Sequence, residues 1–169
     1  QDTPVPAENL LGEEHRGFNH AMEILTSSRI IIAAQSVGIG QSALEAAVRY
    51  AQQRQTFGKP IAEHQGIQFM LADMAAEVHA ARVTTMNAAT LKDAGMPFLQ
   101  EASIAKLLAS EMCIRVADKA IQVHGGAGYF QEAGVERILR DARVTTIYEG
   151  TSEVQRLLIA RQLLAQYPV

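Results

Sequence analysis

Apolar residues recur at intervals of three and four along most of this chain, which is the spacing that buries one face of an α-helix. Proline interrupts helices, and it stands only at positions 4, 6, 60, 97 and 168. Three long stretches are therefore free to form helices. The first, residues 17 to about 54, is expected to be one long helix, or two helices with a weak point at Gly38 and Gly40.

Two further long helices are expected after a turn at residues 56–60. The second ends at the sequence Gly95-Met96-Pro97, and its apolar stripe consists of Ile67, Leu71, Met74, Val78, Ala81 and Thr85. The third spans about residues 98–123, and its predicted buried face consists of Ala105, Leu108, Met112, Val116, Ala120 and Val123. Short turns between long helices favour antiparallel packing.

The last third of the chain is expected to contain a short helix, an extended segment and a final helix. The short helix covers about residues 135–141, and residues 144–148 are predicted to be extended because branching at Cβ restricts helical rotamers. The final helix begins at Gly150-Thr151, with Thr151 as its N-cap, and is predicted to bury Val154, Leu157, Leu158 and Leu164. The predicted fold is all-α, an antiparallel four-helix bundle.

Composition narrows the classes of partner. Of the 169 residues 48% are hydrophobic, and 15 Lys and Arg against 18 Asp and Glu give a formal net charge of −3. Basic residues are scattered rather than clustered, so nucleic acid is not an expected partner. The longest apolar run, residues 30–34, is far shorter than the roughly 20 residues of a membrane-spanning helix, so no membrane partner is expected. Since the sequence begins with Gln1, a targeting segment cannot be judged from it.

Metal and thiol chemistry are not favoured by the pattern. No Glu is followed by His three residues later, the pairing that a di-iron site in a helical bundle needs, so no metal is expected. Cys113 has apolar or small neighbours on a predicted helix. We therefore interpret Cys113 as a packing residue rather than a nucleophile.

Two loops contain residue types found in ligand-binding or catalytic sites. In residues 124–128, glycines bring backbone N–H groups together as a pyrophosphate site needs, although a helix C-cap followed by a turn explains the same sequence. Glu149 lies beside Gly150, which lets another molecule approach the backbone; Glu149 could be a general base, or could only complement a helix dipole. Arg54, beside the turn at 56–60, suits a phosphate and equally suits solvent.

Four segments, in this order, resemble the C-terminal helical domain of the acyl-CoA dehydrogenases, flavoproteins that desaturate acyl thioesters. They are RQTFG at residues 54–58, HQ at 64–65, QVHGGAGY at 122–129, and RDAR at 140–143 followed by IYEGTSEVQR at 147–156. The resemblance covers nearly the whole chain. It is closest to short-chain or short branched-chain members.

The resemblance implies a reaction in which Glu149 is the base that removes the α-proton of an acyl-CoA. The β-hydrogen leaves as hydride to N5 of FAD, which gives the trans-2-enoyl-CoA. Arg29 and Gly150 are assigned to the substrate side of the site, Arg29 because it positions or polarises Glu149. Some members carry the base at the position of Ser28, and the serine here favours Glu149. His124, where many members have Leu, is interpreted as capping the helix end.

The same resemblance implies FAD as the cofactor, with predicted contacts at Arg54, Phe57, Gln65, Gln122, Gly125, Gly126, Thr151 and Glu153. The loop at 122–126 matches the one that receives the adenine and diphosphate half of the cofactor. In the family these contacts are divided between subunits, so FAD is expected at the interface of a homodimer or homotetramer. Electrons are expected to pass to an electron-transferring flavoprotein.

Family members are more than twice as long as this chain. Residues 1–14 are accordingly predicted to be a tail from a middle β-domain that the sequence lacks, and residues 15–169 the C-terminal helical bundle domain. The chain alone is then expected to be inactive and to hold little or no FAD. The alternatives are an acyl-CoA oxidase-like flavoenzyme and a helical assembly module without catalysis. The expected location is the bacterial cytoplasm or the mitochondrial matrix.

Overall fold

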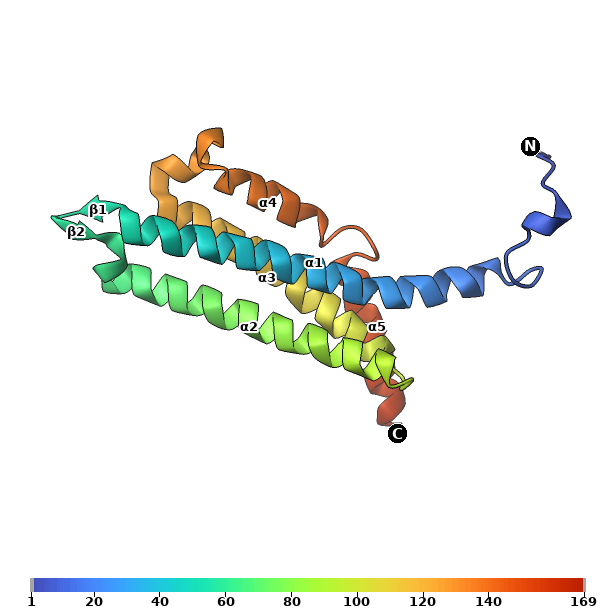
Figure 1. The fold of residues 1–169 in the computed structure, drawn as a ribbon. Coiled ribbons are helices and arrows are strands. Elements are labelled where there is room, and N and C mark those ends of the chain that lie inside the picture. Colours follow the sequence, from blue (N-terminus) through green and yellow to red (C-terminus); the bar gives the residue numbers. More distant parts are fainter. Residues whose placement is uncertain (1, 169) are drawn as a thin grey trace.

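Three long helices form the body of the molecule in the computed structural model, which describes residues 2–168 (Figure 1). α1 spans Gly17–Gln53, α2 spans Gln65–Asp93 and α3 spans Leu99–His124. Two shorter helices follow, α4 at Val135–Val144 and α5 at Ser152–Gln166. Consecutive helices from α1 to α4 run antiparallel (Figure 1), so the predicted all-α bundle is confirmed.

The connections between the helices contain short elements. An antiparallel ribbon of β1 (Gln55–Thr56) and β2 (Lys59–Pro60) joins α1 to α2. Its turn residues Phe57 and Gly58 both have positive φ, +52° and +79°, as a two-residue hairpin turn of the mirror-image type requires. Four 3₁₀ turns lie at Ala7–Asn9, Ile61–Glu63, Gly125–Tyr129 and Gln131–Ala133.

The core lies mainly where α1 packs against α3, and much of it is alanine. Ala33, Ala43 and Ala105 are fully buried, and such small side chains let the two helix axes approach each other. At Gly40 an added Cβ would lie 2.7 Å from Sδ of Met112, so a larger residue would displace the Met112 side chain. α1 passes through its glycines without a break, which decides between the two predicted alternatives in favour of one helix.

The predicted stripes of α2 and α3 are largely confirmed. On α2 the buried members are Met74, Val78, Ala81 and Thr85, and those near its start, Ile67 and Leu71, are half-buried. On α3 the buried members are Ala105, Met112, Val116, Ala120 and Val123. Leu108 is exposed, contrary to the prediction, because the contact surface of α3 faces α1 and α2 on the side of Ala105 and Ala109.

α1 extends beyond the other helices at its N-terminal end, where residues 2–16 lead away from the bundle (Figure 1). Phe18 and Ile24 on these first turns are exposed. By length and composition alone α1 could cross a membrane, which the longest apolar run did not suggest. Core helices of soluble proteins share this property, and α1 packs against α2, α3 and α4.

The prediction of an extended segment at 144–148 is wrong. α4 continues to Val144, and the backbone N–H groups of Ile147 and Tyr148 both donate to its carbonyl, which makes a turn. The hydroxyl of Thr145 donates to the Ala142 carbonyl at 2.8 Å. Threonine hydroxyls that bond the preceding helical turn supply the pairing that a strand neighbour would otherwise give, and this outweighs β propensity.

The predicted buried face of α5 is also wrong. Ser152 and Gln155 are the buried residues of this helix, because Gln155 turns inward to bond the loop before it. The predicted face lies outward instead, with Leu158 half-buried and Val154, Leu157 and Leu164 exposed, Leu164 at 72%. The predicted N-cap is confirmed, since Thr151 Oγ1 accepts from the Val154 N–H at 3.4 Å.

Candidate functional site

The loop between α4 and α5 holds Glu149 and Gly150 in an unusual backbone conformation. Both have positive φ, +55° for Glu149 and +90° for Gly150. A Cβ at Gly150 would lie 2.6 Å from Nε2 of Gln155, so this position requires glycine both for its φ and for its space. A non-glycine residue at positive φ persists only where its surroundings fix it, and such residues gather at functional sites.

Three polar side chains fix this loop. Lys106 Nζ donates to the Gly150 carbonyl at 2.7 Å, and Gln155 Nε2 donates to the same oxygen at 3.0 Å. The Tyr148 hydroxyl donates to Oε1 of Gln35 on α1 at 2.7 Å. The loop is therefore tied to α1, α3 and α5 at once.

The Glu149 carboxylate is half-buried against α1. Ser28 Oγ donates to its Oε2 at 2.6 Å and also lies 3.1 Å from the Leu25 carbonyl. Arg29, the next residue on α1, is 6% exposed, and burial lowers its pKa while the charge of Glu149 opposes that shift. The structure thus brings the predicted base and the predicted arginine together.

Arg29 Nε and Nη1 are buried and have no hydrogen-bond partner within residues 2–168. A buried guanidinium that lacks acceptors is costly, so these donors suit an acceptor from a ligand or from another part of the protein. We call Ser28, Arg29, Lys106, Glu149 and Gly150 the base site.

Lys106 is the member of the base site that the sequence analysis missed. Its side chain is fully buried although it lies in the middle of α3. The available signal was its position beside Ala102, Ala105 and Ala109, on the apolar face of that helix, where a lysine is rarely found.

A second group of predicted residues gathers at the far end of α1. Arg54 lies in one pocket with the loop of Gly125 and Gly126; its volume is about 480 Å³, and Tyr50 and His124 also line it. Gly125 has φ +59°, and a Cβ at either glycine would meet no atom within 4 Å. The glycines therefore leave open space at an exposed surface, unlike the crowded Gly150.

Other side chains around this pocket are exposed or stacked. Phe57 is 96% exposed at the tip of the ribbon, and Gln65 is exposed at the first position of α2. His124 Nδ1 bonds the Ala120 carbonyl at 2.7 Å, and its ring stacks on Tyr50 with centroids 4.2 Å apart. The interpretation of His124 as capping the helix end stays a prediction, because the carbonyl that its ring contacts lies one turn before the end of α3. We call Arg54, Phe57, Gln65, Gly125 and Gly126 the hairpin site.

Gln122 is exposed in the last turn of α3 and does not line this pocket. Thr151 and Glu153 lie beside Glu149 rather than at the hairpin site, and both line a separate pocket of about 260 Å³ with Ser152. A hydrogen bond from its own backbone N–H, then one from Thr151, lowers the pKa of Glu153. Ser152 Oγ is buried without a partner in the described part of the chain.

The predicted contacts to one cofactor thus fall into two sets. Arg29, which neighbours Glu149, lies on α1, and Arg54 is the residue that follows the end of α1, 25 positions later; at a rise of 1.5 Å per residue this is about 37 Å along the helix. A single chain therefore offers two partial sites rather than one complete site.

The residues present fit a dinucleotide with a flavin. The hairpin site supplies a cation and open glycine backbone, which suit a diphosphate, and the base site supplies unpartnered guanidinium donors. In residues 2–168 no group of three His, Cys, Asp or Glu could hold a metal ion. Cys113 is fully buried, as its interpretation as a packing residue requires, and burial raises its pKa.

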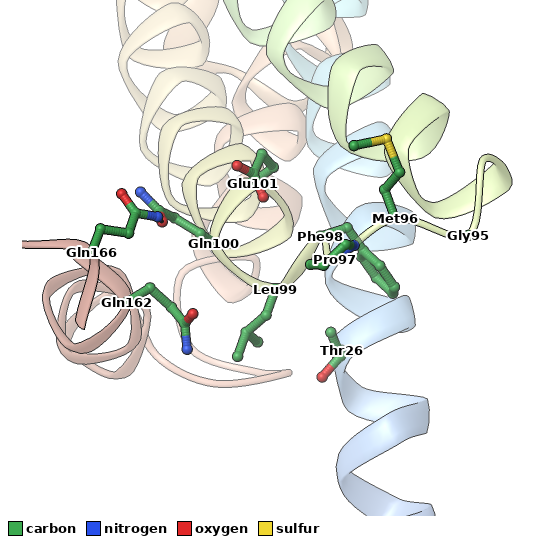
Figure 2. Close-up of a pocket in the computed structure, with 10 residues that line it drawn as sticks. All are labelled: Thr26, Gly95, Met96, Pro97, Phe98, Leu99, Gln100, Glu101, Gln162 and Gln166. Atoms are coloured by element: carbon green, nitrogen blue, oxygen red, sulfur yellow. Dashed lines mark hydrogen bonds between the residues drawn. The ribbon is translucent and has the colours of Figure 1, made fainter. Parts of the chain in front are cut away.

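A larger pocket, of about 630 Å³, lies where the turn between α2 and α3 meets α5 (Figure 2). Thr26, Phe98 and Gln162 line it, and Gln166 Nε2 donates to Oε1 of Gln100 at 2.7 Å across one side. None of the predicted site residues lines this pocket. Size alone therefore does not mark the candidate site.

Comparison with known proteins identifies relatives of this chain. A family model described as "Acyl-CoA dehydrogenase, C-terminal domain" matches residues 15–164. A probable acyl-CoA dehydrogenase of Bacillus subtilis is 56% identical over 164 residues, which cover 97% of this chain and 43% of that protein. A subunit of the caffeyl-CoA reductase-Etf complex of Acetobacterium woodii is 50% identical, with the same two shares of 97% and 43%.

Among solved structures, butyryl-CoA dehydrogenase from Megasphaera elsdenii matches with a TM-score of 0.94 and 49% identity. The match covers 97% of this chain and 43% of that one. The chain therefore spans less than half the length of the relatives it matches.

Proposed function

This chain belongs to the acyl-CoA dehydrogenase family, whose C-terminal domain it matches, and from this membership we propose that the protein containing it desaturates acyl-CoA thioesters with FAD. The observation that carries the proposal is the convergence of Glu149, Arg29 and Ser28 at one loop of fixed backbone. The product is the trans-2-enoyl-CoA.

Glu149 is the proposed base for the α-proton of the thioester. Its carboxylate accepts the proton, and the electron pair of the C–H bond moves toward the thioester oxygen, where negative charge develops. That oxygen needs preorganised donors. The backbone N–H of Glu149 donates to no group in the part of the chain that is described, which leaves it available for this purpose.

FAD would be held by two chains. The hairpin site, with Gln122, would hold the adenine and diphosphate half, and Thr151 and Glu153 would contact the flavin beside the base. The separation of about 37 Å along α1 between Arg29, beside the base, and Arg54 supports this division, because it keeps the two sets of residues of one chain far apart. When bound, FAD supplies the acceptor for two electrons and the β-hydrogen. The protein would then be a homodimer or homotetramer.

The names of the relatives support a short acyl chain and a flavoprotein acceptor. One relative is a butyryl-CoA dehydrogenase, and another belongs to a complex with an Etf. We take butyryl-CoA as the first substrate to test and an electron-transferring flavoprotein as the acceptor. Location in the bacterial cytoplasm or the mitochondrial matrix remains part of this proposal.

The test uses the FAD-loaded protein at full length, without oxygen. Adding butyryl-CoA should bleach the flavin absorbance and form the 2-enoyl-CoA, and an electron-transferring flavoprotein should restore the absorbance. Turnover in air with stoichiometric hydrogen peroxide would instead indicate an acyl-CoA oxidase. No bleaching with any member of a panel of acyl-CoA thioesters would contradict the proposal.

A further inference from the structure

Lys106 is a buried cation that the proposed reaction does not yet use. It lies on α3, none of its side-chain surface is exposed, and it is the largest fully buried side chain among residues 2–168. Lysine is almost never buried to this degree unless its ammonium has a partner. In the described part of the chain, the Gly150 carbonyl is the acceptor of its one hydrogen bond, at 2.7 Å.

That carbonyl lies at the centre of the base site. It accepts from Lys106 on α3 and from Gln155 on α5, at 2.7 and 3.0 Å. Two donors from two helices fix the peptide plane after Gly150. The preceding residues have φ of +55° and +90°, a combination that a chain does not adopt without such support.

The geometry points to Lys106 as a positioning residue for Glu149. By holding the Gly150 carbonyl it fixes the backbone of the loop, so that the Glu149 carboxylate and N–H keep the orientation that proton abstraction needs. This inference rests on the proposed function, in which Glu149 is the base. Lys106 itself does not touch the reacting atoms.

Charge is a second way in which Lys106 could act, and the two are separable. Burial lowers the pKa of Lys106, the charge of Arg29 lowers it further, and Glu149 and Glu153 oppose this shift. The Lys106 ammonium therefore interacts electrostatically with the Glu149 carboxylate. Glutamine at this position retains an N–H donor for the carbonyl without the charge, whereas methionine removes both the donor and the charge at similar length.

The experiment is anaerobic stopped-flow reduction of the full-length, FAD-loaded protein by butyryl-CoA. We expect Lys106→Met to lower the rate constant of flavin reduction about 10- to 100-fold, the usual cost of a small misplacement. The half-saturating butyryl-CoA concentration should change by less than about threefold. The kinetic isotope effect with butyryl-CoA deuterated at the α-carbon should rise, because proton abstraction becomes more limiting.

In Lys106→Gln the rate constant of flavin reduction should lie within about fivefold of that of the unmodified protein. A fivefold loss corresponds to the net contribution of about one hydrogen bond. Partial misfolding lowers the amplitude of the reaction and leaves its rate constant and isotope effect unchanged. A folded glutamine variant that is more than about tenfold slow would overturn positioning through the carbonyl. If Lys106→Met does not fold, Lys106→Gln still tests the positioning role.

Lys119→Met is the matched control, because Lys119 lies on the same helix and pairs with Glu77 at 3.0 Å, away from the base site. Its rate constant should equal that of the unmodified protein. An unmodified protein that butyryl-CoA and other acyl-CoA thioesters fail to reduce would overturn the proposed function, and this inference with it. A reducible protein in which Lys106→Met has the normal rate constant and isotope effect would overturn this inference alone.

Discussion

The base site lies against the N-terminal half of α1 and the hairpin site lies beyond its C-terminal end, and the two are built in opposite ways. At the base site, side chains from α1, α3 and α5 hold one loop, and Gly150 is crowded by Gln155. At the hairpin site, Gly125 and Gly126 face open space. Hydrogen bonds within the chain hold the loop of the base site, whereas the glycine backbone of the hairpin site is open.

This difference indicates what each site needs. A general base must be held in one orientation, and the base site has the hydrogen bonds to do so. In the proposed function the hairpin site receives a cofactor and a second subunit, and such a surface stays open in a single chain; Phe57 there is 96% exposed at φ +52°.

Among the changes that compare the two sites, the largest expected effect tests the crowding at the base site. Gly150→Ala places a Cβ 2.6 Å from Nε2 of Gln155, so the Gln155 amide that bonds the loop must shift, and a φ of +90° strains the alanine backbone. We expect flavin reduction to slow about 100-fold in the full-length protein, measured by anaerobic stopped-flow. Gly38→Ala is the control, since a Cβ there meets no atom within 4 Å and φ is not positive. Equal rates for the two variants would show that the crowding is irrelevant.

The next effect tests the open site. Arg54→Ala removes the cation of the hairpin site, and we expect the FAD dissociation constant to rise about tenfold or more. At saturating FAD the rate of flavin reduction should be unchanged. Arg49→Ala, on the same helix but paired with Glu45, should leave FAD affinity unchanged. Normal FAD affinity after Arg54→Ala would show that Arg54 of the hairpin site does not contribute to FAD binding.

A smaller effect concerns the hydrogen bond that holds the base. Ser28→Ala removes the donor that lies 2.6 Å from Oε2 of Glu149. We expect flavin reduction to slow about fivefold, which is the value of one ordinary hydrogen bond. FAD affinity, measured by equilibrium titration, should not change. A drop in FAD affinity without a slower reduction would place Ser28 in cofactor binding instead.

The smallest effect, at the hairpin site, is expected to stabilise the 169-residue chain and to weaken FAD binding by the full-length protein. Phe57→Gly relieves a left-handed backbone at an exposed aromatic residue that buries little surface in this chain. We expect the free energy of unfolding of the 169-residue chain to rise by about 0.5–1 kcal/mol in urea denaturation. The full-length protein should meanwhile bind FAD less tightly. A destabilised chain would mean that Phe57 already packs within this domain.

Helix positions followed from the sequence because their apolar spacing is determined locally, as the buried stripe of α2 shows at Met74 and Val78. The turn at 144–148 could not be predicted in this way. The hydroxyl of Thr145 bonds back to α4, and this hydrogen bond outweighs the β propensity of the segment. The outward face of α5 could not be predicted either. Gln155 is buried because it bonds the loop that contains Gly150, and this contact forms only in the folded chain.

The candidate site divides in the same way. Glu149 and Arg29 came from a resemblance over short motifs, and the structure brings them together across 120 positions. Lys106 was missed because it carries no motif, and only the packing of α3 under the loop shows what it contacts. Long-range contacts of this kind are set by topology rather than by local pattern.

The assignment of the base is tested most directly by Glu149→Gln in the full-length protein, followed by FAD titration and anaerobic addition of butyryl-CoA. We expect FAD affinity to remain within about twofold, because Glu149 is far from the hairpin site, and flavin reduction to slow about 10³-fold or more. Flavin that still bleaches at the normal rate would contradict the assignment of Glu149 as the base.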